Sequence, residues 1–118
     1  MKVFLVEDSP LLLGRLQALL ANIPGADTVG HAESAREAIE KIAATAPDGV
    51  VLDLSLREGN GFDVLRALAG RPVDCYILTN HPIEGFRAVA MRLGAKGFFD
   101  KSTEFQQLKD VLAARAAA

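Results

Sequence analysis

Short runs of consecutive apolar residues alternate along the chain with longer segments in which apolar residues recur every three or four positions. A short continuous apolar run is typical of a strand buried on both faces of a sheet, and the longer spacing is typical of a helix with one buried face. We expect strands at residues 3–6, 28–32, 50–52, 75–78 and 97–99. Their alternation with helices predicts an α/β fold, in which a five-stranded parallel sheet is doubly wound with five helices.

Signals for the starts of helices lie between the expected strands. Ser9 followed by Pro10 suits an N-cap and the first helical position, and Ser34 with Glu37 forms the capping-box pattern S-x-x-E. We expect the fourth helix to begin near Pro82 and the last helix to end in a frayed tail of alanine and arginine. The apolar stripe of the fourth helix consists of Phe86, Val89, Ala90 and Leu93.

Length and composition limit the classes of protein that fit. The chain has 118 residues, half of them hydrophobic, and a formal net charge of −2, so we expect a single domain over residues 1–118 without repeats or linkers. Nothing in the sequence forms a clearly basic face, so we expect no direct nucleic-acid contact. A membrane-spanning helix needs about 20 consecutive apolar residues, and no run approaches that length. With one unpaired cysteine, Cys75, these features predict a cytoplasmic protein that does not bind membranes.

Polar side chains follow four of the expected strands at their carboxyl ends. Glu7 and Asp8 follow the first strand, and Asp53, Thr79 and Lys101 follow the third, fourth and fifth. Sites in open parallel sheets form at this edge, so we expect the five side chains to converge if their strands adjoin. Three carboxylates repel one another unless protons or a cation intervene, and Mg²⁺ prefers oxygen ligands. With an ammonium and a hydroxyl that can contact phosphate, the set is suited to phosphoryl transfer.

Taken together, these motifs resemble those of the receiver domain of response regulators in two-component signalling. The likeness covers essentially the whole chain and implies a flavodoxin-like (β/α)5 fold. The matching segments are Val6-Glu7-Asp8, Val51-Leu52-Asp53-Leu54, Ile77-Leu78-Thr79 and Gly94-Ala95-Lys96-Gly97-Phe98-Phe99-Asp100-Lys101, with Gly61 eight residues after Asp53. Any one of them is a weak signal, but all of them in order at the family's spacing are strong evidence.

The resemblance implies roles for the residues of the predicted cleft. Asp53 would accept a phosphoryl group from a sensor histidine kinase or a phosphotransfer protein. Asp8, Asp53 and the backbone carbonyl of Ser55 would coordinate Mg²⁺, and Glu7 would bind a metal-bound water. Lys101 would pair first with Asp53 and then with the phosphate. Such a protein is not an enzyme in the usual sense, because it catalyses only its own phosphorylation and dephosphorylation.

The resemblance also implies a switch. Thr79 would move toward the phosphate, and Phe98 would follow that movement. The fourth helix, the fifth strand and the fifth helix would then form a face for a downstream protein target or for a second copy of the chain. Phe98 has a second explanation, since an aromatic residue on an edge strand is often simple packing.

Asn80 and His81 depart from the family pattern, in which a small residue usually follows the threonine. One interpretation is that they control water access to phosphorylated Asp53 and so the rate of dephosphorylation. The alternative is that they cap the helix expected near Pro82.

Two further positions where the family often has proline are Arg57 and Ser102. A cis peptide costs about 2.5–4 kcal/mol when the following residue is not proline, so we expect a trans bond between Lys101 and Ser102.

The same residues bear on four other functions. The chain could be a receiver cut from a longer DNA-binding response regulator, which stays open. A pseudo-receiver that is never phosphorylated is disfavoured because every acidic and basic site residue is present. An aspartate-nucleophile phosphatase usually has a carboxylate two residues after the nucleophile, where this chain has Ser55. A nucleotide-binding protein is disfavoured because no glycine-rich phosphate loop follows the first strand.

Overall fold

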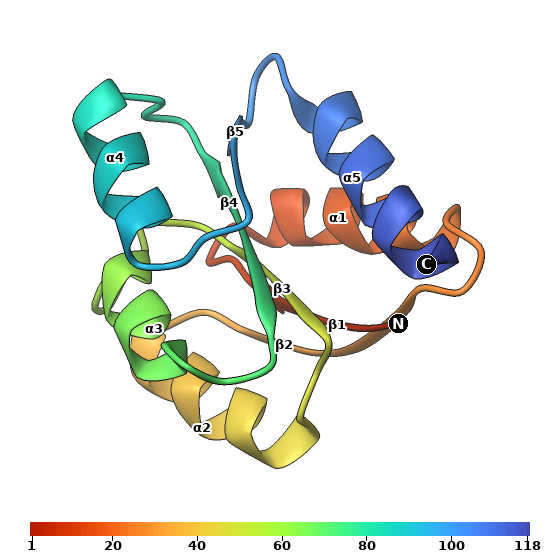
Figure 1. The fold of residues 1–118 in the computed structure, drawn as a ribbon, viewed down its shortest axis with the longest axis horizontal. Helices are drawn as coiled ribbons and strands as arrows, with labels where there is room; N and C mark the ends of the chain where they lie inside the picture. The colour runs from red at the N-terminus through yellow and green to blue at the C-terminus, as the bar shows by residue number, and fades with distance from the viewer.

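The computed structural model describes all residues from Met1 to Ala118, and strands alternate with helices throughout (Figure 1). The strands are β1 (Lys2–Val6), β2 (Asp27–Ala32), β3 (Gly49–Leu52), β4 (Asp74–Thr79) and β5 (Gly97–Asp100). The helices are α1 (Pro10–Ala21), α2 (Ala35–Thr45), α3 (Gly61–Leu68), α4 (Glu84–Arg92) and α5 (Phe105–Ala117). The predicted number, type and order of the elements are confirmed.

The five strands form one parallel sheet in the order β2-β1-β3-β4-β5. Helices α1 and α5 cover one face of the sheet, and α2, α3 and α4 cover the other (Figure 1). The chain runs outward from β1 to the β2 edge and then returns to the other side of β1 through β3. This reversal marks the position at which ligands bind in open α/β sheets, at the carboxyl ends of β1 and β3.

Strand residues pack alternately into two hydrophobic cores, which explains their continuous apolar sequence. In β1, Val3 and Leu5 pack beneath α1 and α5, whereas Phe4 and Val6 pack beneath α2, α3 and α4. Because successive side chains of a strand point to opposite faces, a strand covered on both faces must be apolar at every position.

The predicted starts of α1 and α2 are confirmed. The Ser9 hydroxyl accepts a hydrogen bond from the Leu12 amide over 3.3 Å, and the Ser34 hydroxyl accepts one from the Glu37 amide over 3.2 Å. Each bond satisfies an amide of the first helical turn, which has no partner within its own helix.

Helix α4 begins later than predicted. Its first residue is Glu84, and the N-cap residue is Ile83, which provides no side-chain hydrogen bond. The alternative that Asn80 and His81 cap this helix was therefore wrong. The predicted stripe on α4 is also only partly buried: Phe86 is 38% exposed and makes an edge-to-face contact with Phe62 of α3, at 5.9 Å between ring centroids.

The expected frayed C-terminal tail was wrong too, since α5 continues to Ala117. Arg115 Nε lies 3.1 Å from Asp74 Oδ2, and Ala116 packs against the core beneath α1 and α5. These long-range contacts stabilise the last turn of the helix.

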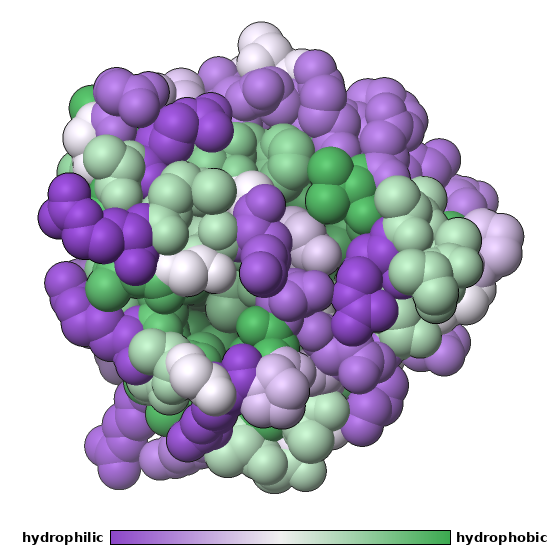
Figure 2. All heavy atoms as spheres, in the orientation of Figure 1, coloured by the Kyte–Doolittle hydropathy of each residue, from purple (hydrophilic) through white to green (hydrophobic).

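On the face drawn in Figure 2, hydrophilic residues form most of the outer rim, and hydrophobic residues reach the surface between them. All peptide bonds are trans, including the bond between Lys101 and Ser102. None of the helices has the length and apolar character required to cross a lipid bilayer.

Candidate functional site

The strand order brings the predicted site residues to one edge of the sheet. Strand β3 lies between β1 and β4, and β5 follows β4. Backbone pairing continues just past the strands, because the Asp53 amide donates to the Val6 carbonyl over 3.0 Å and the Lys101 amide donates to the Thr79 carbonyl over 2.9 Å. The predicted convergence of the carboxyl ends is therefore confirmed.

Lys101 lies between two buried carboxylates. Its Nζ is 2.9 Å from Asp53 Oδ2 and 3.0 Å from Glu7 Oε1. Asp53 is 4% exposed and Glu7 is 2% exposed. Burial alone would lower the pKa of Lys101, but the hydrogen bonds to Asp53 and Glu7 outweigh it and leave that pKa raised.

Glu7 uses both of its carboxylate oxygens. Oε1 contacts Lys101, and Oε2 accepts a hydrogen bond from the Ser9 amide over 3.0 Å. Burial raises the pKa of Glu7 above its ordinary value, although these hydrogen bonds act in the opposite direction. Ser9 was not predicted as a site residue, because a backbone amide leaves no trace in the sequence.

The Asp53 carboxylate is oriented at both oxygens. Oδ2 contacts Lys101, and Oδ1 accepts a hydrogen bond from the Ser55 amide over 3.0 Å. A donor oxygen of Asp53 lies within 4.8 Å of one from Glu7 and one from Asp8. Three carboxylates against one ammonium leave an excess of negative charge. Together with an all-oxygen donor set, that excess fits a hard divalent cation such as Mg²⁺.

These groups open onto a small polar cavity of about 190 Å³. No hydrophobic residue lines it. The lining residues are Glu7, Asp8, Ser9, Asp53, Ser55, Asn80, His81 and Lys101. Asn80 and His81 thus face the same space as the acidic residues. A larger groove of about 450 Å³ lies between α2 and α3, and none of the three buried polar residues, Glu7, Asp53 and Thr79, lines it.

Thr79 lies beside this cavity without lining it. Its side chain is fully buried, and its Oγ1 accepts a hydrogen bond from the His81 amide over 3.1 Å. The threonine hydroxyl is thereby tied to the first residues of the loop between β4 and α4.

Phe98 is buried on the edge strand β5, and its ring packs against the side chain of Arg87. The Arg87 guanidinium of α4 is 4.9 Å from the centre of the Phe98 ring, and Arg87 Nη2 donates to the Phe98 carbonyl over 3.2 Å. Sequence reasoning did not single out Arg87, since its pairing with β5 is a tertiary contact between residues eleven positions apart.

Comparison with known proteins agrees with this geometry. The family model for the response regulator receiver domain matches residues 3–113. The chain is 38% identical to the DNA-binding transcriptional activator DevR/DosR of Mycobacterium tuberculosis, covering 98% of this chain and 56% of the relative. It is 33% identical to a protein-glutamate methylesterase/protein-glutamine glutaminase of Geobacillus kaustophilus, covering 92% of this chain and 34% of the relative. The chain thus spans little more than half of the first relative and a third of the second.

Two solved structures extend the comparison to three dimensions. The response regulator domain of Thermotoga maritima CheB superposes with a TM-score of 0.85 at 26% identity, covering 99% of this chain and 93% of that one. A two-component response regulator of the LuxR family from Aurantimonas sp. SI85-9A1 gives a TM-score of 0.90 at 30% identity, covering 98% and 84%. With the acidic cleft at the carboxyl ends of its strands, the chain belongs to the response regulator receiver domain family of two-component signalling.

Proposed function

We propose that this receiver accepts a phosphoryl group on Asp53 from a sensor histidine kinase or a phosphotransfer protein. Membership of the family implies a histidine kinase partner. The observation that carries the assignment to Asp53 is the state of its carboxylate: buried, oriented by Lys101 and the Ser55 amide, and open to a wholly polar cavity. Glu7 has a comparable pair of contacts, with Lys101 and the Ser9 amide, so the receiver-like segment Val51-Leu52-Asp53-Leu54 is what distinguishes Asp53 from it.

In the proposed transfer, an oxygen of Asp53 attacks the phosphorus of a phosphohistidine. A P–O bond forms as the P–N bond breaks, and the imidazole nitrogen keeps the electron pair and takes up a proton from solvent. Lys101, released from Asp53 Oδ2, then pairs with a phosphoryl oxygen. The Thr79 hydroxyl donates to another phosphoryl oxygen once its side chain turns toward the cavity. Positioning and charge neutralisation supply most of the catalysis in such a reaction.

We propose Mg²⁺ as the cation, with Asp8, Asp53 and the backbone carbonyl of Ser55 as its protein ligands. When bound, the ion neutralises the charge that accumulates between carboxylates and phosphoryl oxygens. Glu7 would bind a metal-bound water, the role that the resemblance to the receiver family implies for it, and its donor oxygen lies within 4.8 Å of those of Asp8 and Asp53.

The proposed output is a change of protein contacts at the face formed by α4, β5 and α5. Thr79 and Phe98 would link this face to the phosphoryl group, and the target would be a downstream protein or a second copy of the chain. The contact of Arg87 with the Phe98 ring supports this idea, because moving the ring would also loosen α4 from β5. Such a switch is a two-state equilibrium that the phosphoryl group biases.

We further propose that Asn80 and His81 set the lifetime of the phosphoryl group by controlling water access to it. Both line the cavity, and neither caps α4. Asn80→Ala should change the half-life of the phosphorylated protein, measured by loss of the phosphoryl group after the donor is removed. Equal half-lives for Asn80→Ala and the unmodified sequence would contradict the role of Asn80.

The residues from 1 to 118 would form one receiver domain, acting alone or within a longer regulator. The relation to a DNA-binding transcriptional activator of M. tuberculosis, of which the chain spans 56%, supports the second possibility. A pseudo-receiver that is never phosphorylated is less well supported, because the buried contacts of Asp53 with Lys101 and Ser55 are all present.

The experiment is incubation of the protein with Mg²⁺ and acetyl phosphate, followed by intact-mass measurement. We expect a gain of one phosphoryl group that requires Mg²⁺ and that Asp53→Asn abolishes. Asp63→Asn, which changes an exposed carboxylate on α3, is the matched control and should be phosphorylated normally. No gain of mass with acetyl phosphate, and none with a phosphorylated histidine kinase, would point to the pseudo-receiver.

A further inference from the structure

The loop between β3 and α3 is a closed turn that begins at Asp53. The Gly61 amide donates to the Leu54 carbonyl over 3.0 Å, and Ser55 pairs with Asn60 as an isolated antiparallel bridge. Leu54 is 5% exposed and packs in the core beneath α2 and α3. The turn therefore fixes the position of Ser55, whose amide donates to Asp53 Oδ1.

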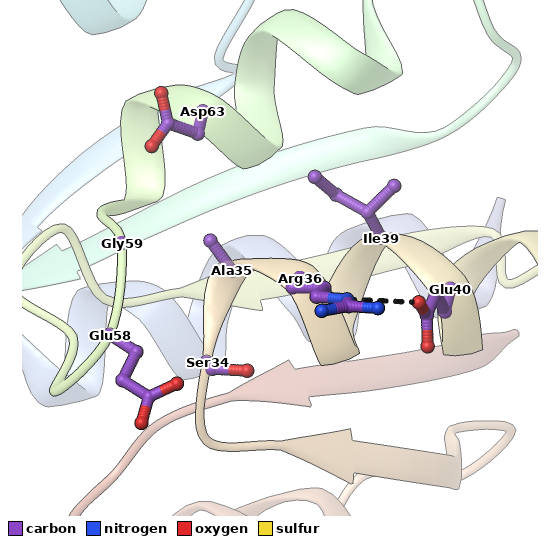
Figure 3. A pocket seen from close by; sticks show the side chains of 8 residues that line it. All are labelled: Ser34, Ala35, Arg36, Ile39, Glu40, Glu58, Gly59 and Asp63. Atoms are coloured by element: carbon purple, nitrogen blue, oxygen red, sulfur yellow. Dashed lines mark hydrogen bonds and ion pairs between the residues drawn. The ribbon is translucent and has the colours of Figure 1, made fainter.

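The far end of the same loop lies against the first residue of α2. The Ala35 amide donates to the Glu58 carbonyl over 3.1 Å, and Ser34 and Glu58 pair as an isolated parallel bridge. Because the first amides of a helix have no partner within that helix, this bond satisfies one of them. Figure 3 shows Glu58 and Gly59 beside Ser34 and Ala35, at one end of the groove between α2 and α3.

Gly59 approaches Ala35 so closely that no side chain fits between them. The φ angle of Gly59 is +76°, a backbone conformation that glycine adopts without steric penalty. A β-carbon added at Gly59 would lie 2.7 Å from the β-carbon of Ala35. Carbon atoms of close-packed interiors lie about 3.5–4.0 Å apart, so a larger residue at position 59 would displace the loop or α2.

We propose that the contact between Gly59 and Ala35 positions the β3–α3 loop for cation binding at Asp53. Gly59 and Ala35 are then positioning residues, which act through Ser55. The inference rests on the proposed function, because it concerns the Ser55 carbonyl as a metal ligand and the Ser55 amide as the group that orients Asp53. With Leu54 fixed in the core, displacing the other end of the turn shifts the residues between them, and Ser55 is the first of these.

The test is the Kd for Mg²⁺ of the unphosphorylated protein, measured by NMR from the shift of the Ser55 amide. We expect Gly59→Ala to raise this Kd about tenfold, a usual effect of changing a group that orients a metal ligand. Gly70→Ala is the matched control, since Gly70 has a φ of +80° and no atom lies within 4 Å of an added β-carbon. Gly70→Ala places a β-carbon on a backbone with positive φ, as Gly59→Ala does, but it creates no contact. The Kd of Gly70→Ala for Mg²⁺ should stay within about twofold of the unmodified sequence.

A second substitution separates the contact from general damage. Adding Ala35→Gly to Gly59→Ala removes the β-carbon that the new methyl group meets, and the Kd should return toward that of the unmodified sequence. If Gly59→Ala alone does not fold, Ala35→Gly alone decides, because it opens the same contact from the other side. A raised Kd in Ala35→Gly then supports the inference, and an unchanged Kd overturns it.

Two outcomes for folded protein would overturn the inference: an unchanged Kd in Gly59→Ala, or an equal rise in Gly70→Ala. Phosphorylation of the unmodified sequence by acetyl phosphate separates this failure from failure of the proposed function. If the protein is phosphorylated on Asp53 but its Kd for Mg²⁺ does not change with the residue at position 59, the proposed function stands and only the inference about Gly59 is contradicted. If the protein neither binds Mg²⁺ nor is phosphorylated, both the proposed function and the inference are contradicted.

Discussion

The carboxyl ends of the parallel strands form one side of the sheet, here called the carboxyl edge, and their amino ends form the opposite side, the amino edge. These two edges differ in how their charges are balanced. At the carboxyl edge, the buried carboxylates of Glu7 and Asp53 share the single ammonium of Lys101. At the amino edge, Asp74 has its own partner in Arg115, at 3.1 Å, and both side chains are partly exposed.

Asp48 shows the same balance at the amino edge. Its carboxylate accepts a hydrogen bond from the Lys2 amide over 2.7 Å, and this bond lowers the pKa of Asp48 below its ordinary value. The carboxylates at the amino edge thus have partners within the chain or are solvated by water. Their contacts connect elements that are distant in the sequence. At the carboxyl edge the negative charge exceeds what the chain neutralises, and a buried excess is costly unless a cation binds. The unbalanced edge is therefore the one suited to a ligand.

The largest expected effect on stability follows from removing the shared ammonium. Lys101→Ala should lower the free energy of unfolding by about 3 kcal/mol, because Glu7 and Asp53 are left buried without a counter-charge. Urea unfolding in the presence of EDTA measures it. A loss below about 1 kcal/mol, the size usual for exposed ion pairs, would show that the two edges do not differ.

The second effect is stabilisation by the proposed metal ion. At a Mg²⁺ concentration 100 times its Kd, the free energy of unfolding of the unmodified sequence should rise by about 2.7 kcal/mol. Asp8→Asn should lose most of this gain, because it removes a proposed ligand at the unbalanced edge.

Thermal unfolding with and without Mg²⁺ measures this gain, and the exposed carboxylate change Asp63→Asn serves as the control. Equal gains in Asp8→Asn and Asp63→Asn would place the ion elsewhere.

A third prediction concerns Cys75, a buried residue beside Asp74 near the amino edge. Burial raises the pKa of its thiol from 9.0 to about 12. Below pH 9 the thiol is protonated in both states. As the pH rises from 9 toward 12, the unfolded thiol ionises while the folded one does not, so stability falls. At pH 10 the loss from this group should be about 1.4 kcal/mol.

Urea unfolding of the unmodified sequence and of Cys75→Ala at pH 8 and pH 10 isolates the contribution of the Cys75 thiol to the free energy of unfolding. The unmodified sequence should lose more stability between the two pH values than Cys75→Ala does. Equal losses in the two proteins would show that Cys75 is not shielded from water.

The smallest effect is expected at the amino edge itself. Arg115→Ala should lower the free energy of unfolding much less than Lys101→Ala does, because the ion pair with Asp74 is partly exposed and water solvates both groups. Urea unfolding under the conditions used for Lys101→Ala gives a direct comparison. A loss as large as that of Lys101→Ala would remove the distinction between the edges.

The sequence predicted the carboxyl edge well because the parallel sheet determines it. The convergence was expected if these strands adjoined, and the strand order places β1, β3, β4 and β5 side by side, so the residues after them lie together. The contact of Lys101 with Asp53 was implied by the resemblance to the receiver family, and it is present at 2.9 Å. The expectation for Ser9 was confirmed as an N-cap, whereas its amide contact with Glu7 was not foreseen.

What the sequence did not predict depends on packing between elements. Arg87 contacts Phe98 only because α4 lies against β5, and a helical arginine usually faces solvent. The last turn of α5 contacts Asp74 through Arg115, and these two residues are 41 positions apart. The late start of α4 at Glu84 could not be predicted from a capping pattern, because Ile83 provides no cap.

Mapping the phosphoryl group to a single residue tests the central claim most directly. After phosphorylation with acetyl phosphate and Mg²⁺, borohydride reduction converts a phosphorylated aspartate to homoserine, which peptide mass spectrometry then locates. We expect homoserine at position 53 and at no other acidic position. Homoserine at position 8, or a fully phosphorylated protein with an unmodified Asp53, would contradict it.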